Sequence, residues 1–120
     1  MPSVILFRPT YDPNTRSTPT YPWALMYLAS VLIDRGVDVT IVDEPCTPNS
    51  EERVKALLQE KLPVAVGITS MTGDQIRFGL AFAKLVRDNS KAAIVWGGIH
   101  PSLLPEQTAA HPLVDYLIAG

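Results

Sequence analysis

Short apolar runs of β-branched, aliphatic and aromatic residues alternate with helical patterns along the whole of this 120-residue chain. Continuous runs of this kind are typical of strands that are buried on both faces of a parallel sheet. Because strand and helix alternate, the sequence predicts a parallel sheet wrapped by helices, with right-handed crossover connections. The predicted strands are 4–7, 38–42, 65–68, 92–96 and 115–119.

Five strands in 120 residues correspond to one domain of the α/β class, covering residues 1–120. The predicted architecture is a three-layer, Rossmann-like fold of flavodoxin-like size, with the strand order 2-1-3-4-5. Ligands of such open sheets bind outside the carboxyl ends of the strands, where the strand order reverses. The loops that follow the strands are therefore the segments in which to look for a site.

Capping signals set the expected ends of the helices. Gly36 is expected to end the first helix in a left-handed conformation, and Asn49 with Glu52 matches a capping box at the start of the second. The helices are expected from 20–22, from 47–50 and after Thr72, with a short helical turn at 105–110.

The first helix is apolar on nearly every side between residues 23 and 33. A helix of this kind is normally buried on several sides, whereas one sheet can cover only one of them. We expect Leu25, Leu28 and Leu32 to face the sheet. Trp23 and Tyr27, with Met26 beside them, are then left for a partner surface.

Charge and cysteine content exclude several classes of function. The chain has 10 Lys and Arg against 12 Asp and Glu, with no block of like charge, which argues against a nucleic-acid or anionic-membrane surface. Its longest apolar stretch has 11 residues, too short to cross a bilayer, and no secretory signal is visible, so we expect a cytoplasmic location. A single cysteine, Cys46, excludes an internal disulfide and a multi-cysteine metal site supplied by this chain.

Three loops after strands carry residues suited to binding. Residues 8–20 form a long segment with three prolines and no glycine, and long loops in compact domains are usually functional or mobile. Residues 69–75 place hydroxyl groups before a helix, where they suit an anion or amide or simply cap the helix. Gly97 and Gly98 allow close approach of a flat ligand or simply form a turn.

Other ligand classes lack their motifs in this chain. A phosphoacceptor domain needs acidic side chains where Arg8 and Ser70 stand. The dinucleotide motif G-x-G-x-x-G and the P-loop motif do not occur. Cys46 has no histidine near it in sequence, which favours an ordinary loop residue over a nucleophile.

An ordered set of motifs covers almost the whole chain. It comprises a first helix of the type P-x-G-L-x-Y-L-A, then V-G-I-S/T-x-M/T-T, then G-G-x-H-P/A-S/T and P-x-x-D-Y, matched at 22–29, 66–72, 97–102 and 112–116. In this set the chain resembles the N-terminal cobalamin-binding domain of B12-dependent radical SAM enzymes. Ala24 replaces the usual glycine of the first helix. The C-x-x-x-C-x-x-C motif that binds an iron–sulfur cluster is missing.

The resemblance implies that the domain binds cobalamin at the carboxyl edge of the sheet. Gly97 and Gly98 would allow close approach of the nucleotide tail, whereas side chains from Met71 to Gln75 would lie beneath the corrin ring, with Gln75 or Arg77 near cobalt. His100 is as well explained by a loop hydrogen bond as by ligand contact. The candidate cofactor-binding residues are Pro9, Thr10, Tyr11, Ser70, Met71, Thr72, Gln75, Gly97, Gly98, His100 and Ser102.

The resemblance also implies how cobalt is held. Cobalamin proteins that supply a histidine to cobalt use the motif D-x-H-x-x-G, but here Gly98 precedes His100 by two residues and Ala109 precedes His111. The expected state is therefore base-off and histidine-off, with no metal ligand from this chain.

The implied role is that of one part of a methyltransferase that acts on a small molecule. The partner would be a radical SAM domain of the same protein, which holds SAM and a 4Fe-4S cluster; the chain itself supplies no catalytic residue, so its being an enzyme stays undecided. Two alternatives remain open at this stage. One is a flavodoxin-like interaction module without a cofactor, and the other is a flavin or nucleotide binder.

Overall fold

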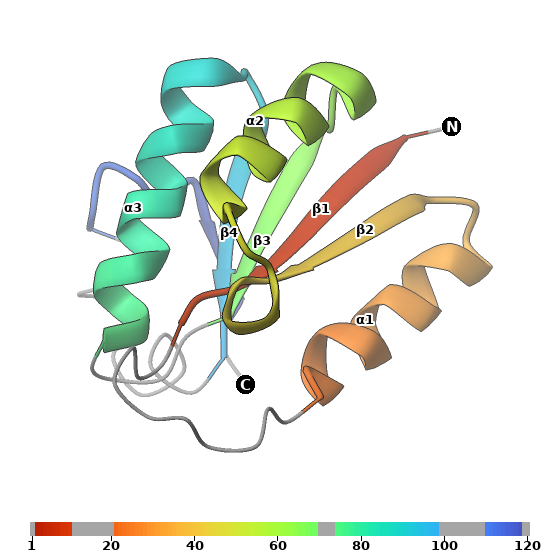
Figure 1. The fold of residues 1–120 in the computed structure, drawn as a ribbon. Coiled ribbons are helices and arrows are strands. Elements are labelled where there is room, and N and C mark those ends of the chain that lie inside the picture. Colours follow the sequence, from red (N-terminus) through yellow and green to blue (C-terminus); the bar gives the residue numbers. More distant parts are fainter. Residues whose placement is uncertain (1, 11–20, 70–73, 99–109, 119–120) are drawn as a thin grey trace.

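The computed structural model describes residues 2–10, 21–69, 74–98 and 110–118 of the chain. Within these residues the strands form one parallel sheet in the order β2-β1-β3-β4-β5, which confirms the predicted class and topology (Figure 1). The strands are β1 (Ser3–Arg8), β2 (Asp38–Asp43), β3 (Ala65–Thr69), β4 (Ala93–Gly97) and β5 (Tyr116–Leu117), and the helices are α1 (Trp23–Asp34), a 3-10 turn (Glu44–Cys46), α2 (Ser50–Lys61) and α3 (Asp74–Asn89).

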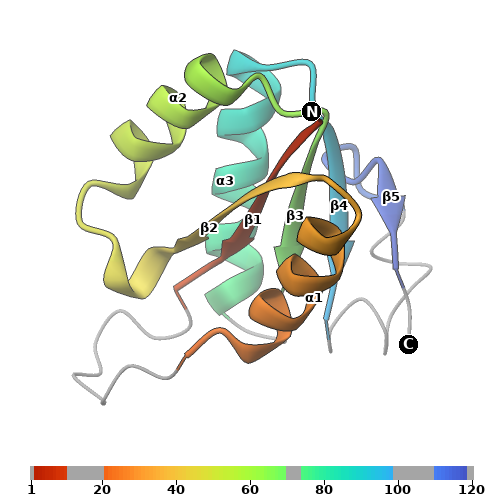
Figure 2. The same ribbon diagram turned by 90° about the vertical axis from the view of Figure 1, so that its right-hand side faces the viewer.

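Strand β1 is the central element of the core. Its successive side chains point to opposite faces of the sheet, and Ile5, Leu6 and Phe7 are all buried. Ile5 and Phe7 belong to the larger core under α2 and α3, whereas Leu6 packs with Leu25 and Ala29 of α1. Helix α1 therefore covers one face of the sheet, and α2 and α3 cover the other (Figure 2).

Helix α1 ends as its sequence predicts. Gly36 has φ +83°, the left-handed conformation expected of a glycine just past a helix end. Its N–H donates to the carbonyl of Ile33, and the N–H of Val37 donates to the carbonyl of Leu32, both at 3.0 Å. These two bonds form a Schellman motif, which satisfies carbonyls that the helix itself leaves without donors.

The predicted capping box of α2 is wrong. Asn49 is the N-cap residue, but its backbone is left-handed (φ 55°) and its side chain makes no capping hydrogen bond. Side-chain capping requires an extended backbone at this position, which aims the oxygen at the amides of the first turn. The carbonyl of Asn49 still accepts the bond from Arg53 N at 3.1 Å, so the helical ladder starts where predicted.

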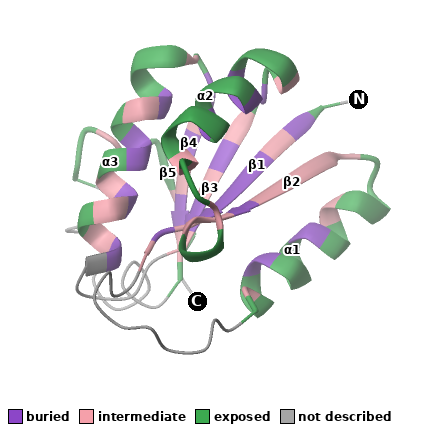
Figure 3. Ribbon diagram, in the orientation of Figure 1, coloured by how far each residue is buried: buried purple, intermediate pink, exposed green. Residues whose placement is uncertain are grey.

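The face of α1 that meets the sheet differs in part from the prediction. Leu25 is buried as expected, but the second buried residue is Ala29, and Leu28 is 41% exposed. Ala29 lies four residues after Leu25, on the same side of the helix. Its small side chain lets α1 approach β1 closely, and Leu28 then lies to the side of this contact. Trp23 and Tyr27 are 66% and 80% exposed, as predicted, and Figure 3 shows both buried and exposed stretches along α1.

No helix in the described ranges combines the length and the apolar character needed to cross a membrane. The helical turn expected at 105–110 falls outside the described residues except for its last position.

Asp115 attaches the short strand β5 to the sheet. Its Oδ2 accepts a hydrogen bond from Ile94 N at 2.8 Å, and its own N–H donates to Ile94 O at 2.9 Å. Arg87 of α3 donates to Oδ1 at 2.9 Å. The Ile94 N–H bond and the Arg87 guanidinium hold the pKa of Asp115 below its ordinary value, against the opposing effect of partial burial.

We predict that Asp115→Asn removes part of the acid sensitivity of the fold. A carboxyl whose folded-state pKa is lowered stabilises the fold above its unfolded-state pKa of about 3.9, and this stabilisation is lost as the pH falls through the folded-state value. Urea midpoints from pH 7 down to about pH 2.5 should therefore fall more steeply in the wild type than in the variant. Parallel curves would contradict the role of this carboxylate.

Candidate functional site

The carboxyl ends of β1 and β3 lie side by side at the point where the strand order reverses. β1 pairs with β2 on one side and with β3 on the other, both in parallel register. The chain leaves β1 toward α1 on one face of the sheet, and it leaves β3 toward α3 on the other face (Figures 1 and 2). This divergence is the feature that places ligand sites in open parallel sheets.

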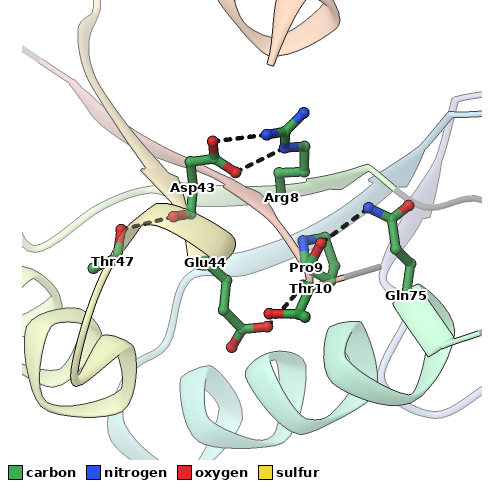
Figure 4. Close-up of polar contacts among 7 residues, drawn as sticks. All are labelled: Arg8, Pro9, Thr10, Asp43, Glu44, Thr47 and Gln75. Carbon is green, nitrogen blue, oxygen red and sulfur yellow. Dashed lines mark hydrogen bonds and ion pairs between the residues drawn. The ribbon is translucent and has the colours of Figure 1, made fainter. Parts of the chain in front are cut away.

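A buried amide joins the two segments that leave this point. Gln75, in the first turn of α3, is 4% exposed, and its Nε2 donates to Pro9 O at 2.9 Å (Figure 4). Pro9 directly follows β1 and is itself buried. Burying an amide is costly unless it is hydrogen-bonded, so this contact holds the start of α3 against the end of β1.

Thr10, the residue after Pro9, is held by a contact from the segment that follows β2. Thr10 N donates to Glu44 Oε1 at 2.8 Å, and Glu44 begins the 3-10 turn that follows β2. The backbone at Pro9 and Thr10 is therefore tied to the segments that follow both neighbouring strands. This contact explains how Pro9 and Thr10, both predicted site residues, are positioned at the edge.

Sequence reasoning missed one strong pair at this edge. Arg8 Nε and Nη2 donate to Asp43 Oδ1 and Oδ2 at 2.7 and 2.8 Å, and both side chains are largely shielded, with 12% and 15% exposed (Figure 4). Bidentate pairs of this kind fix geometry as well as adding energy. The parallel register of β1 and β2 places Arg8 beside Asp43. Alignment of the carboxyl ends of the two predicted strands could therefore have indicated this ion pair.

Gly97 and Gly98 end β4 at the same edge. Gly98 has φ +104°, a conformation that side chains rarely adopt. Among the described residues, an added Cβ at Gly97 would meet only Ile118 O, at 3.9 Å. The described part of the chain therefore leaves space beside the backbone at Gly97, as a close-approaching ligand requires.

Small residues line the α1 face of β3 and β4. Leu6 faces α1, and Gly67 stands beside it in register, where an added Cβ would come within 2.8 Å of Leu6 Cδ2. Helix α1 packs chiefly on β1 and β2, so among the described helices none covers this face of the sheet from β3 outward (Figure 2). The residues on this face pair in register across the two strands: Ala65 of β3 with Ala93 of β4, Gly67 with Val95, and Thr69 with Gly97.

The structure gathers at one edge every predicted site residue that it describes. These are Pro9, Thr10, Gln75, Gly97 and Gly98. Whether they touch a ligand remains a prediction. The other predicted residues lie outside the described ranges, namely Tyr11, Ser70, Met71, Thr72, His100 and Ser102.

His111 lies elsewhere in the fold. It precedes β5 and is exposed, and its Nδ1 accepts a hydrogen bond from Leu113 N at 3.1 Å. This position is on the amino side of a strand, whereas the candidate site is at the carboxyl ends. No group of three or more potential metal ligands occurs among the residues that the structure describes.

Comparison with protein families identifies the cofactor. The B12 binding domain family matches residues 14–120, so the chain belongs to this family, and cobalamin is its cofactor. Comparisons with curated proteins and with solved structures gave no significant match.

The residues at the carboxyl edge fit cobalamin, which combines a broad flat ring with a nucleotide tail. The open space at Gly97 and the small side chains on the α1 face of β3 and β4 would admit a flat or extended group against the backbone. The polar ties at Pro9 and Thr10 would hold the neighbouring loop in place beside it.

Two glycine substitutions separate binding from folding. Gly97→Leu should leave the melting temperature nearly unchanged, because its Cβ enters open space, and should weaken cobalamin binding about tenfold or more by occupying that space. Gly36→Leu should do the reverse, because a side chain at positive φ costs about 1–2 kcal/mol at a helix end away from the site. Binding by ultrafiltration and melting by circular dichroism measure both effects. Normal cobalamin binding by folded Gly97→Leu would show that this glycine is only a turn residue.

Proposed function

We propose that this domain holds cobalamin with its dimethylbenzimidazole off cobalt and with no histidine ligand, and that it presents the cofactor to a radical SAM domain for methyl transfer. The family match supports cobalamin, and the ordered motifs of the sequence support the radical SAM context. The observation that carries the proposal is the open, small-residue surface at the carboxyl ends of β3 and β4.

The histidine-off state rests on two observations. The chain has two histidines, and neither stands in a D-x-H-x-x-G motif. His111 accepts a bond from the turn before β5, on the amino side of that strand. A histidine there is poorly placed to reach a cobalt ion above the carboxyl ends of β1 and β3.

The nucleotide tail is proposed to lie on the α1 face of β3 and β4. Removal of dimethylbenzimidazole from cobalt leaves the tail extended, and an extended tail needs a surface with few projecting side chains. Gly67, Val95 and Gly97 lie in adjacent rows of that surface. The tail would then cover part of the sheet beyond β1, where α1 does not reach.

The first turns of α3 are proposed to lie below the corrin ring. Gln75 is already oriented by its bond to Pro9 O, so its position is set before a ligand arrives. Arg77 is exposed and lies over the Phe78 ring, with Cζ 4.7 Å from the ring centroid. When bound, cobalamin supplies the methyl-transfer chemistry, and the residues of this chain bind and orient it.

The exposed side of α1 is proposed to receive the radical SAM domain. Between Trp23 and Ile33 the helix has no charged residue, and most of its exposed residues are apolar. Figure 3 shows that much of α1 is exposed. Contiguous exposed apolar surface of this kind marks interaction sites in soluble domains. The α1 surface comprises Trp23, Met26, Tyr27, Leu28, Val31 and Ile33.

The cofactor state has a direct spectroscopic test. Protein reconstituted with cob(II)alamin should retain it on a desalting column and show the base-off signature in absorption and EPR, because neither the tail base nor a histidine coordinates cobalt. Nitrogen superhyperfine splitting from an axial ligand would contradict this state. Failure to retain cobalamin, or retention of a flavin instead, would contradict the cofactor assignment for this chain.

The docking surface is tested by a charge placed on it. Val31→Asp, at a position 46% exposed, should weaken association with a radical SAM domain encoded by the same gene or its neighbour at least about tenfold, because the interface would bury an unpaired carboxylate. Val64→Asp is the matched control, since Val64 is 59% exposed outside the α1 surface. Sedimentation velocity of the mixtures measures association, and equal binding by both variants would remove the α1 surface from the proposal.

A further inference from the structure

A cavity of about 350 Å³ opens between α2 and α3, on the face of the sheet opposite α1. Its volume lies in the range of small-molecule pockets, about 300–1,000 Å³. Phe7 and Val54 lie at its base, which places it against the larger core of the domain. The proposed course of the nucleotide tail lies on the other face, whereas the proposed corrin position borders this cavity at Phe78 in the first turns of α3.

The floor of the cavity is aromatic. Phe7 of β1 and Phe82 of α3 stack with ring centroids 3.8 Å apart and planes within 1° of parallel. Both rings are almost completely buried, and Phe78 is half-buried beside them on the same helix. Such a floor suits an apolar body, and ring faces also attract cations.

The rim of the cavity carries more negative than positive charge. Glu44, Glu51 and Asp88 line it together with one cation, Lys84. Lys84 pairs with Asp88 at 3.1 Å, and Glu51 pairs with Lys55 at 3.4 Å. Glu44 differs from these two carboxylates, because no described cation pairs with it.

Among the described residues, the donors to the carboxylate of Glu44 are neutral. Oε1 accepts a hydrogen bond from Thr10 N at 2.8 Å (Figure 4), and Oε2 accepts one from Ser50 Oγ at 3.2 Å. A carboxylate has about four acceptor positions, so two remain. A half-buried charge that faces an aromatic-floored cavity, with no counter-ion from the described part of the chain, favours a cationic ligand.

We propose that this cavity binds a small organic cation, namely a primary ammonium group on a short aromatic or aliphatic body. The ammonium donates to Glu44, and the body lies on Phe78 and Phe82. The site neighbours the proposed corrin position, because Glu44 also accepts the hydrogen bond from Thr10 N. An anion is disfavoured by the three carboxylates, and a neutral apolar molecule leaves Glu44 without its counter-ion.

A ligand series on the wild-type chain tests the proposal. The 2-phenylethylammonium ion, 2-phenylethanol and phenylacetate share one body and differ in charge, and each is titrated into the ¹⁵N-labelled protein. The cation should shift the amides of Glu44, Ser50 and Phe78 and bind at least about tenfold more tightly than the alcohol, while phenylacetate should not bind. Equal shifts from cation and alcohol, or shifts that map to other residues, would overturn the proposal.

Matched substitutions test the role of Glu44 itself. Glu44→Gln keeps an oxygen for Thr10 N but removes the charge, and it should weaken binding of the cation about tenfold with no effect on the alcohol. Glu60→Gln is the control, since Glu60 is exposed on α2 and does not line the cavity. An equal loss in both variants, or none in folded Glu44→Gln, would overturn the assignment. If Glu44→Gln fails to fold, the ligand series on the wild-type chain still tests the proposal.

Discussion

The arrangement of the whole domain depends on burial of strand β1 on both of its faces. Ile5 and Phe7 pack under α2 and α3, whereas Leu6 packs under α1, so one strand joins the two cores. This strand lies inside the sheet rather than at its edge, with β2 on one side and β3 on the other. The reversal of strand order that creates the candidate site follows from that position. Polar contacts from Arg8, Pro9 and Thr10 then fix where the chain leaves the strand.

The fold was predictable from sequence because continuous apolar runs report two-sided burial, and every predicted strand lies within two residues of the observed one at each end. The errors arose where one residue type permits two geometries. Asn49 is a common N-cap, but it also tolerates the left-handed backbone that it adopts here. Leu28 was predicted to face the sheet because it lies on one helical line with Leu25 and Leu32, whereas the buried line runs from Leu25 to Ala29.

The location of the candidate site was predictable because topology alone brings strand ends together, and Gly97 and Gly98 stood at one of those ends. Its supporting contacts were not predictable residue by residue. Arg8 and Asp43 are 35 residues apart, and Glu44 is 34 residues from Thr10, so these pairs depend on the exact register of β1 with β2. The cavity between α2 and α3 depends on the spacing of two helices, which periodicity does not determine.

Amide hydrogen exchange with and without cobalamin tests most directly where the cofactor lies. If it covers the carboxyl ends of β3 and β4, cobalamin should slow exchange at Thr69, Gly97 and Gly98 and in the first turn of α1. Amides at the opposite edge, such as Val64 and Asp38, should be unchanged. Protection confined to that opposite edge, or no protection despite bound cobalamin, would contradict the account.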